Sequence, residues 1–368
     1  QGRIVALGAK IKIPAGTQIL KAHGLQVYPG MIDSGTTLGL VEIKKVDETQ
    51  DHSESGGLQP DLRAGVAINP DSELIPVARA GGITTVMICP SGGTISGQSS
   101  VAKLSGWTAP EMVLRLEAGL HVNWPNGVDS KALKELTSFL DQGRQYQALV
   151  AKAKQDKIPS PIADPRLDAL APYLSGEKPV FVEANSREQI AEALVFAEKQ
   201  KLKIVIAGGA DAWKLAAELK ARDVPVIVGP VMRSPVDAYD PYDAPYANPG
   251  RLHEAGVRFC IRSNNASNSR NTPFEAAMAV AYGLPEDVAL RAVTLSAAEI
   301  LEVADQLGSL TPGKRANLII TDGSPLQQTS QIKAVFIDGE AHQPTSRHSR
   351  LYHRYRRRLH EVQAKKPR

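Results

Sequence analysis

Cysteine and long hydrophobic runs are both scarce in this sequence. Among its 368 residues are two cysteines, Cys89 and Cys260, and each ends an apolar run. Free cysteine packs as a small hydrophobic residue, so we expect two buried, unpaired and unreactive thiols, which identify no redox compartment. No run of eighteen apolar residues occurs, which argues against a transmembrane helix. No charged-then-apolar signal opens the chain, and the sequence does not fix a compartment: we expect a periplasmic or secreted location if Gln1 follows a removed signal segment, and a cytoplasmic one otherwise.

Basic residues are concentrated at one end of the chain. The formal net charge is +4, but residues 347–368 contain nine Lys or Arg and one acid, which leaves the first 346 residues at −4. Apolar residues in this tail recur at helical spacing. The pattern predicts a basic amphipathic helix over 343–368, attached to a mildly acidic body.

Short apolar runs alternate with helical patterns through the middle of the chain. This alternation is typical of a parallel sheet with helical crossovers, and the length suits an α/β barrel with a small second domain. A complete barrel needs an eighth strand, the fourth in order, which we expect somewhere within 125–178, although 132–157 has helical spacing. We therefore predict a distorted (β/α)8 barrel of the TIM type. Seven strands are predicted, at 31–33, 83–89, 119–122, 179–182, 203–207, 225–228 and 257–261.

Two separated motifs stand out, Pro29-Gly30-Met31-Ile32-Asp33 near the N-terminus and residues 307–323 with the strand-like 334–339 near the C-terminus. Together they resemble the amidohydrolase superfamily, with imidazolonepropionase-like members as the nearest pattern. Near the N-terminus, Pro29-Gly30-Met31-Ile32-Asp33 is similar to the first barrel strand of that family. Near the C-terminus, residues 307–323 and the strand-like 334–339 are similar to the return of the chain into the family's small β-domain. The resemblance implies a small discontinuous β-sandwich formed by 1–28 with 305–342, and a metallo-hydrolase-like barrel over 29–304.

The same resemblance exposes a loss of metal ligands. In the family, a His-any-His pair follows the first strand, histidines end strands five and six, and an aspartate follows strand eight. The matching positions here are Gly35 and Thr37, Glu183, about Gly208, and Ser263. Only Glu183 could bind a metal, and a hydrolytic metal needs about three protein ligands. We therefore expect no metal and no cofactor.

Other chemistry at the strand ends depends on a single histidine. Any remaining catalysis is expected from Glu183, His121 and Asp33, either as a mononuclear site or with Ser91 or Ser263 as a nucleophile. The segment 91–98 is interpreted as an ordinary glycine-rich loop at the barrel mouth. Glu183 should be neutralised by a cation, Arg262 by preference. Residues that would contact a small-molecule ligand at the barrel mouth are Ser91, Asn185, Arg262, Ser263 and Asn264.

Two further segments suggest contacts with partners. The loop 233–250 combines three tyrosines with acids and prolines, a composition found in both pocket lids and oligomer interfaces. We favour docking of the basic tail on its own body over contact with nucleic acid or an anionic membrane, because no nucleic-acid-binding fold accompanies it. A homo-oligomer, or a complex with a catalytically intact homologue, is expected.

These observations favour a non-catalytic member of the fold. We interpret the chain as a pseudoenzyme with a degenerate metal site that acts as a binding or structural subunit. The alternative is a hydrolase of non-peptide C–N bonds in a small substrate, with an altered or metal-free site. The two hypotheses differ in whether His121 and Glu183 carry out chemistry.

Overall fold

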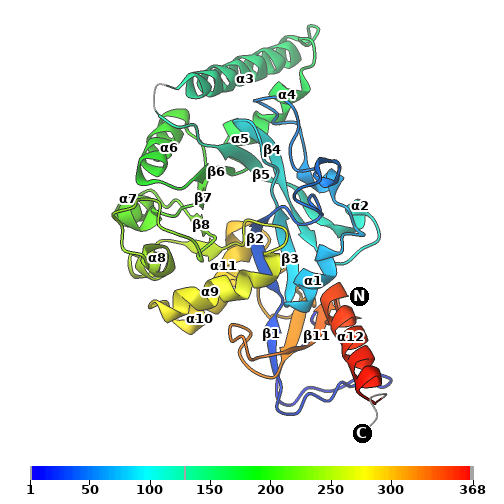
Figure 1. Ribbon diagram of the computed structural model, residues 1–368. Helices are drawn as coiled ribbons and strands as arrows, with labels where there is room; N and C mark the ends of the chain where they lie inside the picture. Colours follow the sequence, from blue (N-terminus) through cyan, green and yellow to red (C-terminus); the bar gives the residue numbers. More distant parts are fainter. Residues whose placement is uncertain (1, 128–129, 365–368) are drawn as a thin grey trace.

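The computed structural model describes residues 2–127 and 130–364 (Figure 1). Gln1 and residues 365–368 of the predicted tail lie outside this part, as do 128–129 within the segment searched for an eighth strand. The strands are β1 (Gln26–Pro29), β2 (Met31–Thr36), β3 (Ile83–Ile88), β4 (Ile95–Lys103), β5 (Val113–Asn123), β6 (Val180–Ala184), β7 (Ile204–Gly208), β8 (Val226–Val228), β9 (Phe259–Ile261), β10 (Leu318–Thr321), β11 (Ile332–Ile337) and β12 (Glu340–His342).

Most helices follow barrel strands. They are α1 (Leu74–Ala80), α2 (Ala109–Met112), α3 (Lys131–Asp156), α4 (Pro165–Ala169), α5 (Ala171–Leu174), α6 (Arg187–Gln200), α7 (Ala216–Ala221), α8 (Ala244–Glu254), α9 (Thr272–Ala281), α10 (Glu286–Ala292), α11 (Leu295–Ile300) and α12 (Arg347–Ala364), with 3₁₀ turns at Asp47–Thr49, Ala64–Ala67, Ala212–Leu215 and Ser269–Asn271. In the part of the chain that the structure describes, no helix has the length and apolarity needed to cross a membrane.

Eight strands form the barrel sheet in the order β2 to β9. All seven strands predicted from apolar runs are present, and the long helix predicted at 132–157 is α3. After β9, the backbone amide of Asn264 donates to the carbonyl of Gly35 at 2.9 Å and links the last strand to the first. The predicted α/β barrel is thus confirmed.

The distortion of the barrel lies in β4. This strand pairs antiparallel with both β3 and β5, whereas the other neighbouring barrel strands pair parallel. The expectation of a strand within 125–178 was therefore wrong, since the strand missing from the sequence count was the third. The fourth is β5, which begins earlier than predicted and carries His121. Interpretation of 91–98 as a loop was also wrong from Ile95 onward.

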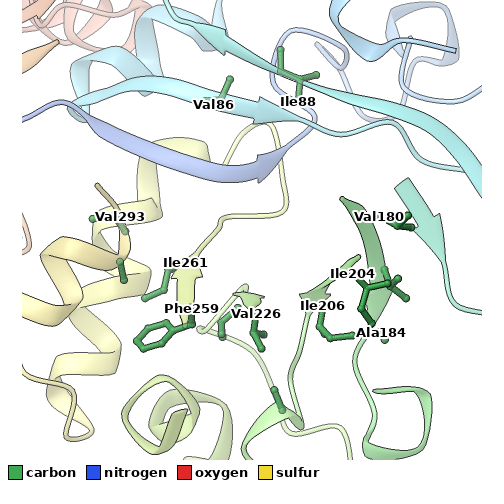
Figure 2. Close-up of a cluster of buried hydrophobic side chains, with 14 of the residues drawn as sticks. Val86, Ile88, Val180, Ala184, Ile204, Ile206, Val226, Phe259, Ile261 and Val293 are labelled. Atoms are coloured by element: carbon green, nitrogen blue, oxygen red, sulfur yellow. The ribbon is translucent and has the colours of Figure 1, made fainter. Parts of the chain in front are cut away.

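Alternation along the strands separates two apolar layers. Val180, Val182 and Ala184 of β6 belong to the outer core on the helix side of the sheet. Figure 2 labels Val180 and Ala184 in this core. Phe181 points the other way, into a second cluster inside the barrel together with Met87 and Cys260. Successive side chains of a strand alternate between faces. Glu183 therefore shares the inner face with Phe181.

Both chain ends contribute to a separate four-stranded antiparallel sheet in the order β1-β10-β11-β12. The described residues form one sheet here, where a sandwich was expected. Between Arg3 and β1, no strand forms, and Ile11, Ile13 and Ile19 are exposed. The short strands predicted throughout 1–28 are thus absent from 5–25. An extended pattern becomes a strand only when its backbone finds a partner.

The cysteines behave as expected from the sequence. Cys89 and Cys260 are both free and buried. Burial raises the pKa of the Cys89 thiol to about 11 and that of Cys260 to about 12. Both thiols are therefore protonated at neutral pH, and neither is a nucleophile.

Candidate functional site

Arg262 is the central residue of the barrel mouth. It follows β9 directly, and its backbone amide donates to the carbonyl of Val228 at 2.9 Å. Its side chain is 1% exposed and turns into the barrel. There Nη2 donates to Glu183 Oε1 at 2.6 Å, and Nε donates to the carbonyl of Gly229 at 3.2 Å. The predicted pairing of Glu183 with Arg262 is confirmed.

The electrostatics of this pair are mutually consistent. Burial alone would raise the pKa of Glu183, but the charge and hydrogen bond of Arg262 outweigh it and hold the pKa below its usual value. Burial alone would lower the pKa of Arg262, and Glu183 reverses that effect. Both groups are therefore ionised at neutral pH and form an ion pair in which Arg262 is fully buried and the Glu183 side chain is 22% exposed.

Two glycines provide space for this cluster, because side chains at their positions would overlap it. A Cβ atom at Gly35 would lie 2.8 Å from Arg262 Cδ, which is too close for any side chain. At Gly208, where φ is +91°, a Cβ would lie 2.6 Å from Asn185 Oδ1 and 2.9 Å from Glu183 Oε1. These are two of the positions at which the family resemblance implies histidine. Neighbouring side chains now fill the space that those imidazoles would need.

His121 lies on the other side of Glu183. Its Nε2 is 3.8 Å from Glu183 Oε2, and its Nδ1 is 3.4 Å from Ser99 Oγ on β4. Burial lowers the pKa of His121 to about 4, and Arg262 contributes in the same direction against the opposing charge of Glu183. The imidazole is consequently neutral at pH 7.

Asp33 is engaged away from the Glu183 cluster. It is fully buried, and it accepts hydrogen bonds from the backbone amide of Ser263 at 2.9 Å and the Ser263 hydroxyl at 2.5 Å. Burial raises the pKa of Asp33, although the Ser263 hydrogen bonds oppose the rise. Asp33 and Ser263 thus tie β2 to the end of β9. With Ser263 so bound to Asp33, the proposed nucleophilic role of Ser263 with His121 finds no support.

The predicted ligand-contacting residues separate into two groups. Asn185 lies with Arg262 at Glu183, and its Oδ1 also accepts from Arg233 Nη1 at 2.9 Å. Ser91 is held at the rim, where its amide donates to the carbonyl of His52 at 2.7 Å. Asn264 is exposed with a left-handed backbone, at φ +55°. The structure therefore brings together Asn185 and Arg262 but not the other three.

Sequence reasoning missed Ser99 as the hydroxyl nearest His121. Ser99 is fully buried in β4, between the equally buried Gln98 and Ser100. Such a polar stretch gives no hydrophobic period from which a strand could be predicted. From the sequence, that hydroxyl was expected to be Ser91 or Ser263, but the Ser91 amide bonds the carbonyl of His52 and the Ser263 hydroxyl bonds Asp33.

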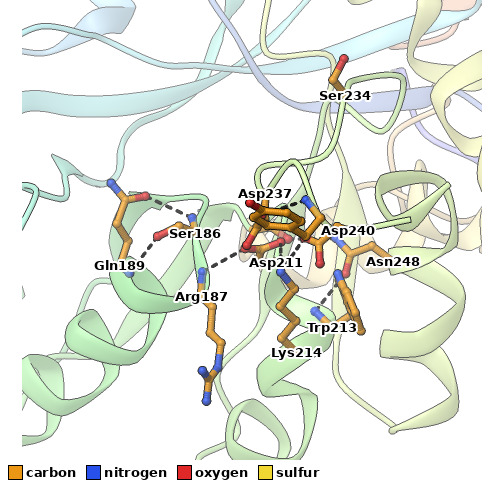
Figure 3. A network of polar contacts seen from close by, with 12 residues as sticks. Ser186, Arg187, Gln189, Asp211, Trp213, Lys214, Ser234, Asp237, Asp240 and Asn248 are labelled. Carbon is orange, nitrogen blue, oxygen red and sulfur yellow. Dashed lines mark hydrogen bonds and ion pairs between the residues drawn. The ribbon is translucent and has the colours of Figure 1, made fainter. Parts of the chain in front are cut away.

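The segment 233–250 is only partly a loop. From Ala244 it forms α8, and Tyr246 packs against Tyr282 with ring centroids 5.0 Å apart. The irregular part is anchored by Asp240, which bonds Lys214 Nζ at 2.5 Å, and Asp211 lies 3.3 Å from the same ammonium (Figure 3). The prediction of a loop through 250 was therefore wrong for α8, which accommodates Pro245 in its first turn, where no backbone N–H is needed, and also contains Pro249 in its interior.

The donor set does not fit a metal centre of the family type. Glu183 is bound to Arg262, Asp33 to Ser263, and His121 to Ser99. Among residues 2–127 and 130–364, no three His, Cys, Asp or Glu side chains are close enough together to hold a metal ion. A divalent cation would also have to approach the fixed positive charge of Arg262. No chemical step is therefore derived through a metal.

The sequence of the C-terminal third and the fold of the whole chain are both similar to known proteins. Residues 246–342, which include Arg262 and strands β9 to β12, match the sequence model of the amidohydrolase family. In this region the chain is therefore similar to the amidohydrolase family. An amidohydrolase from Thermotoga maritima MSB8 has a similar structure, with a TM-score of 0.85 and 24% identity over 92% of each chain. A prolidase solved with N-methylphosphonate-L-proline is more distant, with a TM-score of 0.55 and 16% identity over 93% of each chain.

Among curated proteins, Amidohydrolase tasK of Hapsidospora irregularis is similar over a short region. The two sequences are 33% identical over 91 residues, which is 24% of this chain and 9% of that protein. This chain thus matches about a tenth of the length of its curated relative. These similarities support the superfamily predicted from the sequence, and the finer likeness to imidazolonepropionases stays a prediction.

Proposed function

We propose that this chain is a metal-independent, non-catalytic amidohydrolase that serves as a binding or structural subunit. The observation that carries the proposal is the buried ion pair of Arg262 with Glu183, in a barrel interior where Gly35 and Gly208 replace side chains. Fold alone does not establish or exclude activity, whereas the residues at the barrel mouth determine which chemistry is possible there.

The physical basis is a substitution of one positive charge for another. In the family, a metal ion compensates the carboxylate and imidazole ligands. Here the guanidinium, which keeps its proton throughout the physiological range, compensates Glu183 through a covalently fixed side chain. A buried carboxylate that is already paired has little to gain from a divalent cation. Hydrolysis by a metal-activated water therefore has no support in the residues present.

Metal analysis of the purified chain tests this proposal. After growth with added zinc and manganese, we expect well below one equivalent of any transition metal, and a melting temperature unaffected by chelator. We also expect no hydrolysis of Xaa-Pro dipeptides, N-acyl amino acids or cyclic amides. Stoichiometric metal that is retained by Glu198→Gln, an exposed control, but lost in Glu183→Gln would overturn the proposal.

A second candidate function is a metal-free hydrolase of non-peptide C–N bonds. It is favoured by one arrangement, in which Ser99, His121 and Glu183 follow one another at 3.4 and 3.8 Å. A hydroxyl, a neutral imidazole and a carboxylate in that order are the components of a nucleophile with its base and orienting group. Against it, Ser99 is fully buried and Glu183 is neutralised by Arg262.

A serine-directed fluorophosphonate probe separates the two candidates. The non-catalytic proposal expects no labelling of the folded chain. Labelling or turnover that is lost in Ser99→Ala and His121→Gln, but kept in Ser91→Ala, would establish the hydrolase instead. Ser91 is the matched control because it lies at the rim of the same barrel.

We further propose self-association through the irregular part of the tyrosine-rich segment. Tyr239 and Tyr242 are strongly exposed there, while Asp240 fixes the backbone between them. Exposed tyrosine on an ordered segment buries much area on association at a low cost in entropy. Light scattering should report a dimer that Tyr239→Ser with Tyr242→Ser dissociates. A monomer at every concentration would refute it.

A further inference from the structure

Helix α12 leaves the body of the molecule after its first turn. Arg350 Nη2 lies 3.4 Å from Glu73 Oε2, and His348 Nδ1 lies 3.4 Å from Arg270 Nη1. In Figure 1, the helix extends beside the small sheet, away from the barrel. No residue of α12 is buried. Docking of the tail along its own body, which we expected from the sequence, was therefore wrong.

One face of α12 is apolar and uncovered. Tyr352, Tyr355, Leu359 and Val362 are each between 53% and 59% exposed. At 100° per residue these side chains fall within one stripe about a quarter of a turn wide, which Leu351 extends toward the body. The stripe therefore presents a continuous apolar surface with no partner among the described residues.

Arginines surround this stripe. Between residues 347 and 364 there are six arginines and one acid, Glu361. Arg358 borders the stripe on one side and Arg356 on the other, where it lies 6.0 Å from the ring of Tyr352. The surface that covers this helix must therefore be anionic and also have an apolar layer just beneath its charges.

We propose that α12 binds an anionic lipid surface, lying in the plane of the membrane. The Tyr, Leu and Val stripe enters the boundary between headgroups and acyl chains, and the flanking arginines bind lipid phosphates. Tyrosine suits this depth because its ring is apolar and its hydroxyl stays hydrated. The 18 residues give a helix of about 27 Å, enough for its basic residues to contact several headgroups at once.

Charge and apolarity together favour lipid over the other anionic occupants. A nucleic acid would be held by the arginines alone, and the leucine and valine would stay exposed to water. A second copy of this chain offers a body of net charge −4 spread over 346 residues, with Glu73 as the acid that α12 contacts. A lipid surface satisfies both features of the helix.

Vesicle flotation with the full chain tests the proposal. We expect the protein to float with vesicles of 70% phosphatidylcholine and 30% phosphatidylserine, and to stay below with pure phosphatidylcholine. Replacing Arg356, Arg357 and Arg358 by Gln should lower the partition coefficient about 100-fold, since each basic residue near such a surface contributes about 1 kcal/mol. The matched control replaces Lys152, Lys154 and Lys157 by Gln at exposed positions on and after α3, and should float like the unmodified chain.

The apolar stripe has its own test. Leu359→Asn with Val362→Asn keeps the charge and should lower the partition coefficient at least 10-fold. In Tyr355→Trp, emission should shift to shorter wavelength on anionic vesicles, relative to the unmodified chain. Binding that survives loss of the stripe, or that occurs with poly(U) RNA and not with vesicles, would overturn the proposal. So would a dimer that dissociates on removal of 347–368.

Discussion

A buried arginine is unfavourable unless an acid lies within reach, and Glu183 provides that acid for Arg262 in the barrel. The pair excludes side chains at Gly35 and Gly208, so the cluster forms a mutually dependent unit. Removing one member leaves the other charged and desolvated. The ion pair of Arg262 with Glu183 thus both stabilises the barrel interior and occupies the place of the family's metal site.

Replacement of Arg262 by Met should therefore be strongly destabilising. Glu183 would remain largely shielded from water without its cation, at an expected loss of about 3 kcal/mol in the free energy of unfolding. Urea denaturation at pH 7 measures the change. Arg258→Met, which breaks an exposed pair with Asp223, is the control and should cost about 1 kcal/mol or less. The double variant Arg262→Met with Glu183→Gln should recover most of the loss, and a failure to recover would show that packing, not charge, is the cause.

The neutral imidazole of His121 predicts a pH dependence of stability. Its pKa falls from 6.5 to about 4 on folding, so between these values the unfolded chain binds a proton that the folded chain does not. Stability is then complete above pH 6.5 and decreases toward pH 4 by about 1.4 kcal/mol per pH unit, or about 3 kcal/mol in total. Denaturation midpoints at pH 7, 6 and 5 would reveal the slope.

Ser99, Glu183 and Arg262 face this imidazole, and the slope belongs to His121 only if substitution removes it. His121→Gln should flatten the dependence between pH 7 and 5. His253→Gln, at an exposed position of α8, should leave it unchanged. An equal slope in both variants would assign the effect to other groups.

At the scale of elements, close contact between β5 and β6 depends on Gly119. A Cβ there would lie 2.8 Å from the carbonyl oxygen of Pro179 and would overlap the ring of Phe181. Gly119→Ala should therefore reduce the free energy of unfolding by about 2 kcal/mol or more. Gly57→Ala is the matched control, because its Cβ would meet open space. Equal stabilities in urea would mean that β5 and β6 can separate without cost.

Sequence patterns predicted the helices and strands that bury apolar side chains. The seven apolar strands and α3 follow from hydrophobic spacing. Strand β4 could not be found in this way, because Ser96, Gln98 and Ser99 are buried and polar, with Gln98 Nε2 donating to the carbonyl of Pro60 at 2.8 Å. Such partners are distant along the chain, so no local pattern reports them.

The part of the candidate site that could be predicted from the sequence is the ion pair, because a buried charge needs an opposite charge beside it. A carboxylate at the end of a barrel strand needs a cation, and Arg262 follows the last strand; this reasoning gave the pair correctly. The hydroxyl partner of His121 could not be inferred, because it depends on the antiparallel direction of β4. Expected docking of α12 failed because the acidity of the body is diffuse and Glu73 contacts only the first turn.

For the whole molecule, the exposed tail predicts that folding stability does not depend on it. Deletion of residues 347–368 should leave the melting temperature unchanged within about 2 °C, since no side chain of α12 is buried. Val335→Ala, in the core of β11, is the comparison and should lower it clearly. A large drop on deletion would mean that α12 supports the body after all.

The antiparallel direction of β4 also affects the order in which the strands of this barrel are expected to fold. Parallel neighbours need a long crossover before they can pair, whereas β3, β4 and β5 are joined only by the short segments 89–94 and 104–112. Closing short loops costs less chain entropy, and sequence-local pairing speeds folding. We therefore expect this three-stranded meander to form early, before the parallel strands pair and before the ion pair between β6 and the end of β9 is made.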